Sequence, residues 1–148
     1  MKKFKFRLTA VLKVAQIKKE RAEIAFAEAT NALIKEKESL KIFELELEAG
    51  LKSYEEIENQ KITIGLLTSY NTYFFRLRTQ IEQQKHVINE AEKKRQERLD
   101  EFQEALNKLK TIEQLKEKRL EEFKAEQLIE EQKELDEIGL QIHARAMR

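Results

Sequence analysis

His86 and the carboxylates on either side of it are the residues whose spacing best suits metal chemistry. Glu82 and Glu90 each lie four residues from His86, so on a helix the three side chains share one face and could hold a metal ion. The other histidine, His143, is distant, and neither histidine has the Glu-x-x-His spacing of di-iron helical bundles. An exposed polar helix position explains His86 more simply. Because there is also no Gly-rich phosphate loop, we expect no catalytic residue, no metal, no cofactor and no enzyme activity.

The composition favours long helices over a fold with many turns. Charged residues make up 39% of the 148 and hydrophobic residues 41%, while Pro and Cys are absent and Gly occurs three times. Turns depend on Gly and Pro, so few are expected. The net charge of +1 favours neither a nucleic-acid nor an anionic-membrane partner. No apolar run is long enough to span a bilayer, and Lys5, Arg7 and Lys13 interrupt any signal-peptide core.

Apolar residues recur with the period of a coiled coil. Steps of four and three residues from Leu8 to Ile57 meet apolar side chains at twelve of fifteen positions, and from Leu67 to Ile112 at eleven of fourteen. A period of 3.5 residues is typical of the seam of a left-handed supercoil. The sequence therefore predicts an all-α fold, a long antiparallel two-helix coiled-coil hairpin with an overhanging C-terminal helix end.

The pattern is interrupted once, which places the turn. We expect a single hairpin domain with a first helix over about 5–59, a turn at about 60–65, and a second helix over about 66–144. Asn59 or Gly65 could take the left-handed conformation that ends a helix. Paired residue numbers across the hairpin would sum to about 125, which puts Gly50 opposite Phe74 and Phe75 and leaves room there for a ring.

The charge distribution supports antiparallel pairing. Residues 1–21 hold eight basic side chains and one acidic one, whereas residues 113–137 hold ten acidic and five basic ones. A hairpin sets these stretches side by side, but a parallel homodimer would stack like charges. Surface ion pairs are weak singly, yet in number they select orientation.

Three segments are candidates for partner contacts. The overhang carries Leu128, Leu135, Ile138 and Ile142, which no intramolecular helix covers, and an uncovered stripe usually marks a partner surface. Near the turn lie five apolar residues of which the seam needs only three; the two extra ones either contact a partner or cap the hairpin's own open end. The five are Tyr70, Tyr73, Phe74, Phe75 and Leu77, and the extra ones are Tyr73 and Phe75.

The third candidate is the basic start, where Phe4, Phe6 and Leu8 alternate with Lys5 and Arg7. This alternation indicates an extended, amphipathic arm. It either packs on the overhang or contacts nucleic acid or a membrane surface. The latter two need free positive charge, which the acidic second helix partly neutralises.

The chain resembles the flagellar export proteins of the FliJ family over nearly its whole length. The similar segments are Phe4-Lys5-Phe6-Arg7-Leu8 with Val11-Leu12, Ala25-Phe26-Ala27-Glu28-Ala29, residues 70–84, and Glu131-Gln132-Lys133-Glu134-Leu135-Asp136-Glu137-Ile138. The resemblance implies a non-enzymatic, stalk-like component of the flagellar type III export apparatus, serving flagellum biogenesis, motility and chemotaxis. It would be cytoplasmic and peripherally associated with the inner face of the cell membrane at the flagellar base.

The resemblance also implies the partners. The paired terminal ends would sit in the pore of the hexameric export ATPase and promote its assembly or activity, and the tip would touch the export gate and escort export chaperones. By position, the ATPase-facing residues would be Phe6, Arg7, Lys133, Leu135, Asp136, Glu137 and Ile138. The gate-facing residues would be Tyr73, Leu77, Gln80 and Gln84.

Other functions stay open from the sequence. A coiled-coil holdase for export substrates and their chaperones would bind many apolar peptides and leave ATPase activity unchanged. An RNA-binding helical arm would show affinity that collapses with salt. These patterns do not distinguish the flagellar stalk from its injectisome counterpart. They also do not indicate the oligomeric state or whether the stalk rotates.

Overall fold

The computed structural model describes residues 2–147 and contains two long helices there, α1 (Thr9–Glu58) and α2 (Ile64–Ala146), with no strand in that range. The helices pack against each other, which confirms the all-α helical hairpin. The chain divides into two compact units, one of Met1–Lys19 with Glu104–Arg148 and one of Glu20–Gln103. Each unit takes one segment from either helix. Whether the hairpin is a single domain stays a prediction.

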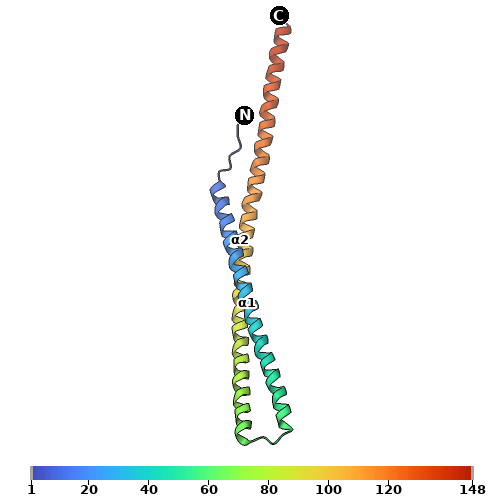
Figure 1. The fold of residues 1–148 in the computed structure, drawn as a ribbon. Coiled ribbons are helices and arrows are strands. Elements are labelled where there is room, and N and C mark those ends of the chain that lie inside the picture. Colours follow the sequence, from blue (N-terminus) through green and yellow to red (C-terminus); the bar gives the residue numbers. More distant parts are fainter. Residues whose placement is uncertain (1, 148) are drawn as a thin grey trace. The chain divides into compact units, whose positions relative to one another are not determined.

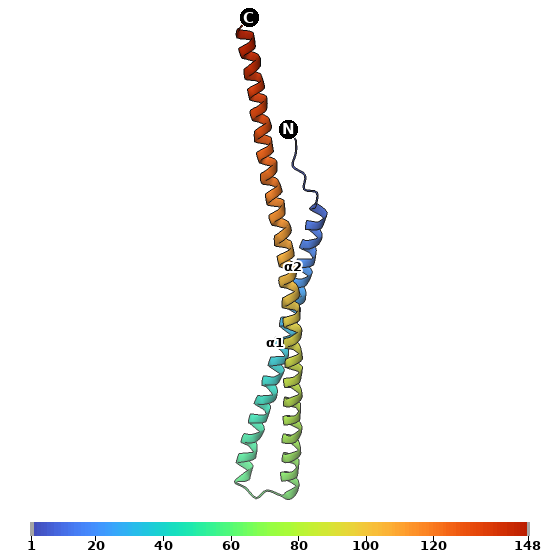
Figure 2. The ribbon, with the colours of Figure 1, turned by 180° about the vertical axis from the view of Figure 1, so that it is seen from behind.

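The unit of residues 20–103 is the hairpin with its loop. In Figures 1 and 2 its two segments run side by side in opposite directions from the connection between α1 and α2. Its most buried side chains all lie on the predicted stripes, and they are Ala29, Leu33, Phe74, Leu77, Ile81 and Ile88. Along the whole chain, each predicted seam position except Leu8 and Leu67 is buried or half-buried. The period of 3.5 residues therefore identified the seam correctly.

The loop is built differently from the sequence prediction. Helix α1 ends at Glu58, where Gln60 N donates to Ile57 O at 2.8 Å. Helix α2 begins at Ile64 because Thr63 caps it, its Oγ1 accepting from Leu66 N at 3.2 Å. Among the described residues no backbone has a positive φ. The predicted left-handed conformation of Asn59 or Gly65 is therefore wrong, since a side-chain cap directs the chain into the second helix instead.

The other unit pairs the chain start with the C-terminal part of α2. Leu12 and Ala15 form a buried cluster with Leu109, against which Phe6 and Ile112 pack. Residues 2–6 are not helical, and α1 begins at Thr9 rather than near residue 5. The reason is the alternation itself: in an extended segment every second side chain faces the same way, so the apolar ones can all meet α2. None of the described helices is both long and apolar enough to cross a membrane.

Candidate functional site

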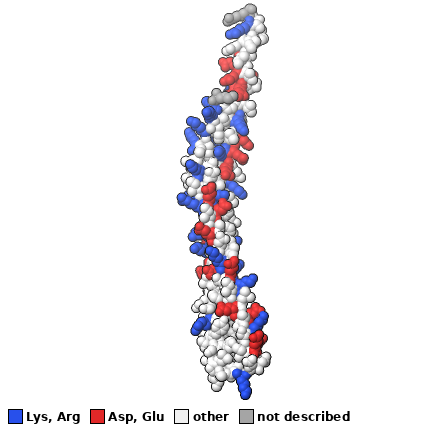
Figure 3. Space-filling view, in the orientation of Figure 1, with Lys and Arg blue, Asp and Glu red and all other residues white. Residues whose placement is uncertain are grey.

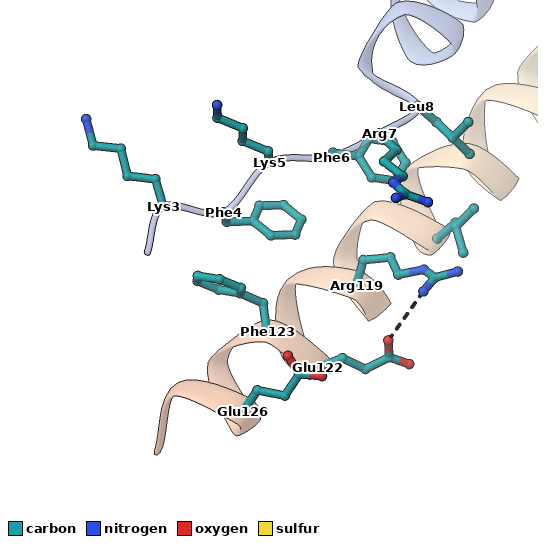
Figure 4. A pocket seen from close by; sticks show the side chains of 11 residues that line it. Lys3, Phe4, Lys5, Phe6, Arg7, Leu8, Arg119, Glu122, Phe123 and Glu126 are labelled. Atoms are coloured by element: carbon teal, nitrogen blue, oxygen red, sulfur yellow. Dashed lines mark ion pairs between the residues drawn. The ribbon is translucent and has the colours of Figure 1, made fainter. Parts of the chain in front are cut away.

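The arm, residues 2–8, is non-helical over 2–6 and turns at Arg7 and Leu8; it lies along α2 and forms one side of a groove (Figure 4). The Phe4 ring faces the Phe123 ring, with centroids 5.5 Å apart and planes tilted by 52°. Phe4 and Phe6 are half-buried, whereas Lys5 and Arg7 are exposed. The expected extended, amphipathic arm is confirmed, and it packs on α2.

The groove has a volume of about 600 Å³ and combines apolar walls with charges of both signs. Lys3 and Lys5 point away from α2 in Figure 4. On α2, Glu122 and Glu126 border the groove, and Arg119 approaches the Glu122 carboxylate at 3.9 Å. The basic start and the acidic stretch of α2 are thus neighbours, as the charge distribution predicted.

Beyond the arm, no other described segment of the chain covers α2. All residues from 128 to 147 are exposed. At about 100° per residue, Leu128, Leu135, Ile138 and Ile142 fall within one quarter of the helix circumference, and we call them the C-terminal stripe. Their exposed fractions lie between 52% and 66%. The predicted overhang and its exposed apolar stripe are therefore both present.

The residues predicted to face the ATPase fall into two separate places. Phe6 packs on the Leu12 cluster and Arg7 borders the groove. The other five lie on the exposed end, and they are Lys133, Leu135, Asp136, Glu137 and Ile138. They lie roughly 35–45 Å along α2 from Leu109, a member of the cluster on which Phe6 packs. At about 100° per residue, Leu135 and Ile138 lie on one side of the helix and Lys133, Asp136 and Glu137 lie on the other, so these five residues surround the helix. Their role in binding an ATPase stays a prediction.

The residues predicted to face the gate also differ in exposure. Leu77 is 3% exposed and belongs to the seam. Gln84 is half-buried because its Nε2 donates to the Glu36 carbonyl at 2.9 Å and to the Glu36 carboxylate at 2.6 Å. Only Tyr73 and Gln80 are exposed. A partner that approaches the four predicted gate-facing residues would therefore reach only Tyr73 and Gln80. Gate binding by all four residues stays a prediction.

Tyr73 is held at the interface of the two helices. Its hydroxyl donates to Glu46 Oε1 at 3.1 Å. Partial burial of the phenol, followed by the hydrogen bond and the charge of Glu46, raises the pKa of Tyr73 above its ordinary value of 10.0. A Cβ built on Gly50 would lie 3.1 Å from both the Tyr73 and the Phe74 rings. The space left by Gly50 was predicted correctly for Phe74, but the second ring is that of Tyr73, because Phe75 is 75% exposed.

Two polar seam contacts were not anticipated. Besides the Gln84–Glu36 pair, Arg95 lies with its Cζ 5.3 Å from the centroid of the Phe26 ring and donates from Nε to Thr30 Oγ1 at 3.3 Å. A signal was present in the sequence: Glu36, Gln84 and Arg95 are non-apolar members of the two stripes. Thr30 and Arg95 also face one another in the predicted pairing, so their hydrogen bond could have been proposed.

No metal centre is formed by the described residues, among which no three His, Cys, Asp or Glu side chains are grouped for one ion. The carboxylates near His86 have other neighbours. Lys85 approaches Glu82 at 3.3 Å, and Lys93 approaches Glu90 at 3.5 Å. These ion pairs are typical of a solvated helix face.

Comparison with known proteins gives a family and a fold. A family model described as the flagellar FliJ protein matches residues 4–148. A solved structure of a protein from Chlamydia trachomatis, described as a proposed YscO homolog, CT670, is similar with 21% sequence identity and a TM-score of 0.64, covering 95% of this chain and 96% of that chain. At this identity the likeness concerns the fold. No curated protein sequence matches this chain significantly.

Proposed function

This chain belongs to the flagellar FliJ protein family, and from that premise we propose that it is a non-enzymatic stalk that binds the hexameric export ATPase and couples it to the export gate. The family is a component of the type III protein export apparatus. Its action on the ATPase and the gate is the proposal. The mechanism is binding energy: the chain promotes assembly or turnover of the ATPase and passes a conformational signal to the gate at the cytoplasmic face of the membrane.

The observation that carries the proposal is the exposed C-terminal end of α2. Residues 128–147 are exposed on every side of the helix, with the C-terminal stripe on one of them. A helix that enters the pore of a ring meets protein all round, so it needs contact residues around its whole circumference. Lys133, Asp136 and Glu137 lie on the side of the helix opposite the C-terminal stripe. A charged side and an apolar side back to back suit such an environment better than they suit one flat partner surface.

The hairpin loop region is the second contact in this proposal. Tyr73 and Gln80 are exposed there, and the chain has no charged residue from 62 to 75. Interfaces are depleted in charge at their centre and enriched in aromatic residues, which supports a role of this region in gate binding. Export chaperones would be escorted through the same region.

A second candidate function rests on Ile129 and Leu140, which are 56% and 71% exposed and lie off the C-terminal stripe. Apolar residues on two sides of one helix suit a holdase that binds varied apolar peptides. This function would leave the ATPase rate unchanged.

The test compares ATP hydrolysis by the export ATPase alone, with the full chain, and with a chain lacking residues 125–148, while sedimentation follows ring assembly. The proposal expects stimulation by the full chain and its loss on truncation. Stimulation that survives truncation would show that the exposed end is not the contact. No effect of the full chain on rate or assembly would favour the holdase.

A further inference from the structure

The beginning of α2 carries an apolar face turned away from α1. Ile64 is 85% exposed and Phe75 is 75% exposed. They are eleven residues apart, which at about 100° per residue places both side chains on one line along the helix. The seam residues Tyr70 and Leu77 lie on the opposite side. We call the line the outer face, and its members between the two large residues are Thr68, Asn71 and Thr72, all exposed.

The outer face carries no charge between its ends, although 39% of the chain is charged. Residues 62–75 contain no Lys, Arg, Asp or Glu, and the loop end of the molecule shows a large uncharged area in Figure 3. Water-facing helix positions elsewhere in this chain are mostly charged. An uncharged face of this kind is a candidate interface.

The hydroxyl groups on and beside this face are already used. Thr68 Oγ1 donates to Ile64 O at 2.9 Å, Thr72 Oγ1 to Thr68 O at 2.9 Å, and Thr79 Oγ1 to Phe75 O at 2.8 Å. A partner that covers these threonines therefore leaves none of their hydroxyl donors unpaired, and for these three side chains the usual cost of burying a polar group is avoided.

We propose that the outer face pairs with the outer face of a second copy of this chain, antiparallel, about a two-fold axis between Asn71 and Thr72. In this register Phe75 of one copy meets Thr68 of the other, and Ile64 meets Thr79. Each large side chain thus faces a small one, as knobs-into-holes packing requires. A two-fold interface must be complementary to itself. The order of large and small side chains along the outer face meets this requirement.

The charged residues at the two ends of the outer face follow the same two-fold symmetry. Lys61 precedes α2, and Glu82 is the first acidic residue of α2. In the proposed register Lys61 of each copy comes near Glu82 of the other. Arg78, about 40° from the position of Ile64 around the helix, lies opposite Gly65 of the other copy, so no like charges face one another at the ends of the apolar centre. A parallel arrangement would set Glu82 against Glu82 and Phe75 against Phe75.

A lipid surface suits the face less well, because α1 ends at the same loop with Glu55, Glu56 and Glu58, which anionic headgroups would repel. The paired segment, 61–82, is only about 33 Å long. One helix face of this length buries less than the roughly 1,600 Å² of a standard interface, so the dimer is weak and forms at high protein concentration. It uses neither the C-terminal stripe nor Tyr73 and Gln80, so disulfide trapping at position 71 tests it without testing the ATPase contact or those two gate-facing residues.

The absence of Cys from the chain makes disulfide trapping a clean test. In the full-length protein, Asn71→Cys brings two thiols close to the axis, within the Cα separation of less than about 7 Å that a disulfide needs. Thr79→Cys, an exposed position on the same face, lies about 22 Å from its own symmetry mate. Each variant is oxidised mildly, and Asn71→Cys also in combination with Phe75→Glu.

We expect Asn71→Cys to form a linked dimer about tenfold faster than Thr79→Cys, and Phe75→Glu to abolish the difference. A mixture of Ile64→Cys and Thr79→Cys should form mainly the mixed disulfide. Equal rates for Asn71→Cys and Thr79→Cys, or rates that ignore Phe75→Glu, would overturn the proposal. Monomeric protein that floats with phosphatidylcholine–phosphatidylglycerol vesicles through this face, without trapping at Asn71→Cys, would assign the face to lipid instead.

Discussion

Gly50 of α1 lies against the ring of Phe74 on α2, so closely that a Cβ at position 50 would come within 3.1 Å of Phe74 Cε1. The Phe74 ring in turn meets the ring of Tyr54, with centroids 6.0 Å apart and planes at 83°. Figure 1 shows the two helices of this unit separating towards the loop, and these large rings lie between them. The absence of a side chain at position 50 is what admits the rings.

Replacing Gly50 by Leu should destabilise the hairpin. The new side chain would enter space already held by Phe74, which is 8% exposed, and overpacking of this kind costs about 1–3 kcal/mol. Thermal unfolding followed by circular dichroism measures the effect as a lower midpoint. Gly139→Leu is the control, since nothing lies within 4 Å of a Cβ there. A midpoint for Gly50→Leu equal to that of Gly139→Leu would contradict the close packing.

Leu77 and Gln80 were both predicted to face the gate, but replacing each by Ala should change the free energy of unfolding by very different amounts. Leu77→Ala removes a side chain that is 3% exposed, and such truncations cost about 2–5 kcal/mol. Gln80 is exposed, so Gln80→Ala should change the free energy of unfolding by less than about 0.5 kcal/mol. Urea unfolding measures both. A small effect of Leu77→Ala on the free energy of unfolding would show that this side chain is not in the seam. Any loss of gate binding in that variant must be interpreted together with its measured stability.

The Gln84–Glu36 pair should behave as one unit. Each of Gln84→Leu and Glu36→Leu leaves its partner with an unmatched polar group in the seam, whereas the double variant removes both. A double-mutant cycle in urea should give a coupling energy of about 0.5–2 kcal/mol. Effects that simply add would mean that the pair makes no joint contribution.

The raised pKa of Tyr73 predicts that the folded chain loses stability at alkaline pH. Its folded-state pKa is raised above 10.0 because of burial and of Glu46, so the folded chain holds the phenol proton more tightly than the unfolded chain does. The resulting contribution to stability is complete below pH 10 and is lost as pH rises from 10 through the folded-state pKa. The midpoint difference between the native chain and Tyr73→Phe should therefore shrink above pH 10. A difference that stays constant up to pH 11 would contradict the Tyr73–Glu46 contact.

The sequence was a good guide wherever a repeating pattern was present. Leu33, Ile81 and Leu109 could be assigned to the seam because burial of one stripe of a long helix requires a regular spacing, and that spacing is visible without coordinates. The exposure of Leu128, Leu135 and Ile142 followed from the lengths of the two helices alone. The position of the basic arm beside acidic α2 followed from charge.

Features that depend on single contacts were harder to predict. Thr63 begins α2 through one side-chain hydrogen bond, and a cap of this kind competes with the glycine that seemed better suited to the turn. The choice between Tyr73 and Phe75 as the second ring near Gly50 depends on an offset of two residues, which is finer than the pairing of helices read from a repeat. Partner-binding roles depend on proteins outside the chain, so the sequence can assign them only through its family.

The measurement that most directly tests the stalk account is the concentration of this protein that half-maximally stimulates the export ATPase, compared for Leu135→Asp and Ile42→Asp. Both native side chains are 63% exposed, but only Leu135 lies on the C-terminal stripe. We expect Ile42→Asp to act like the native chain and Leu135→Asp to need about tenfold more protein or more, the loss typical of a buried interface anchor. Equal stimulation by both variants would contradict the account, because the exposed end of α2 would then not be the surface that binds the ATPase.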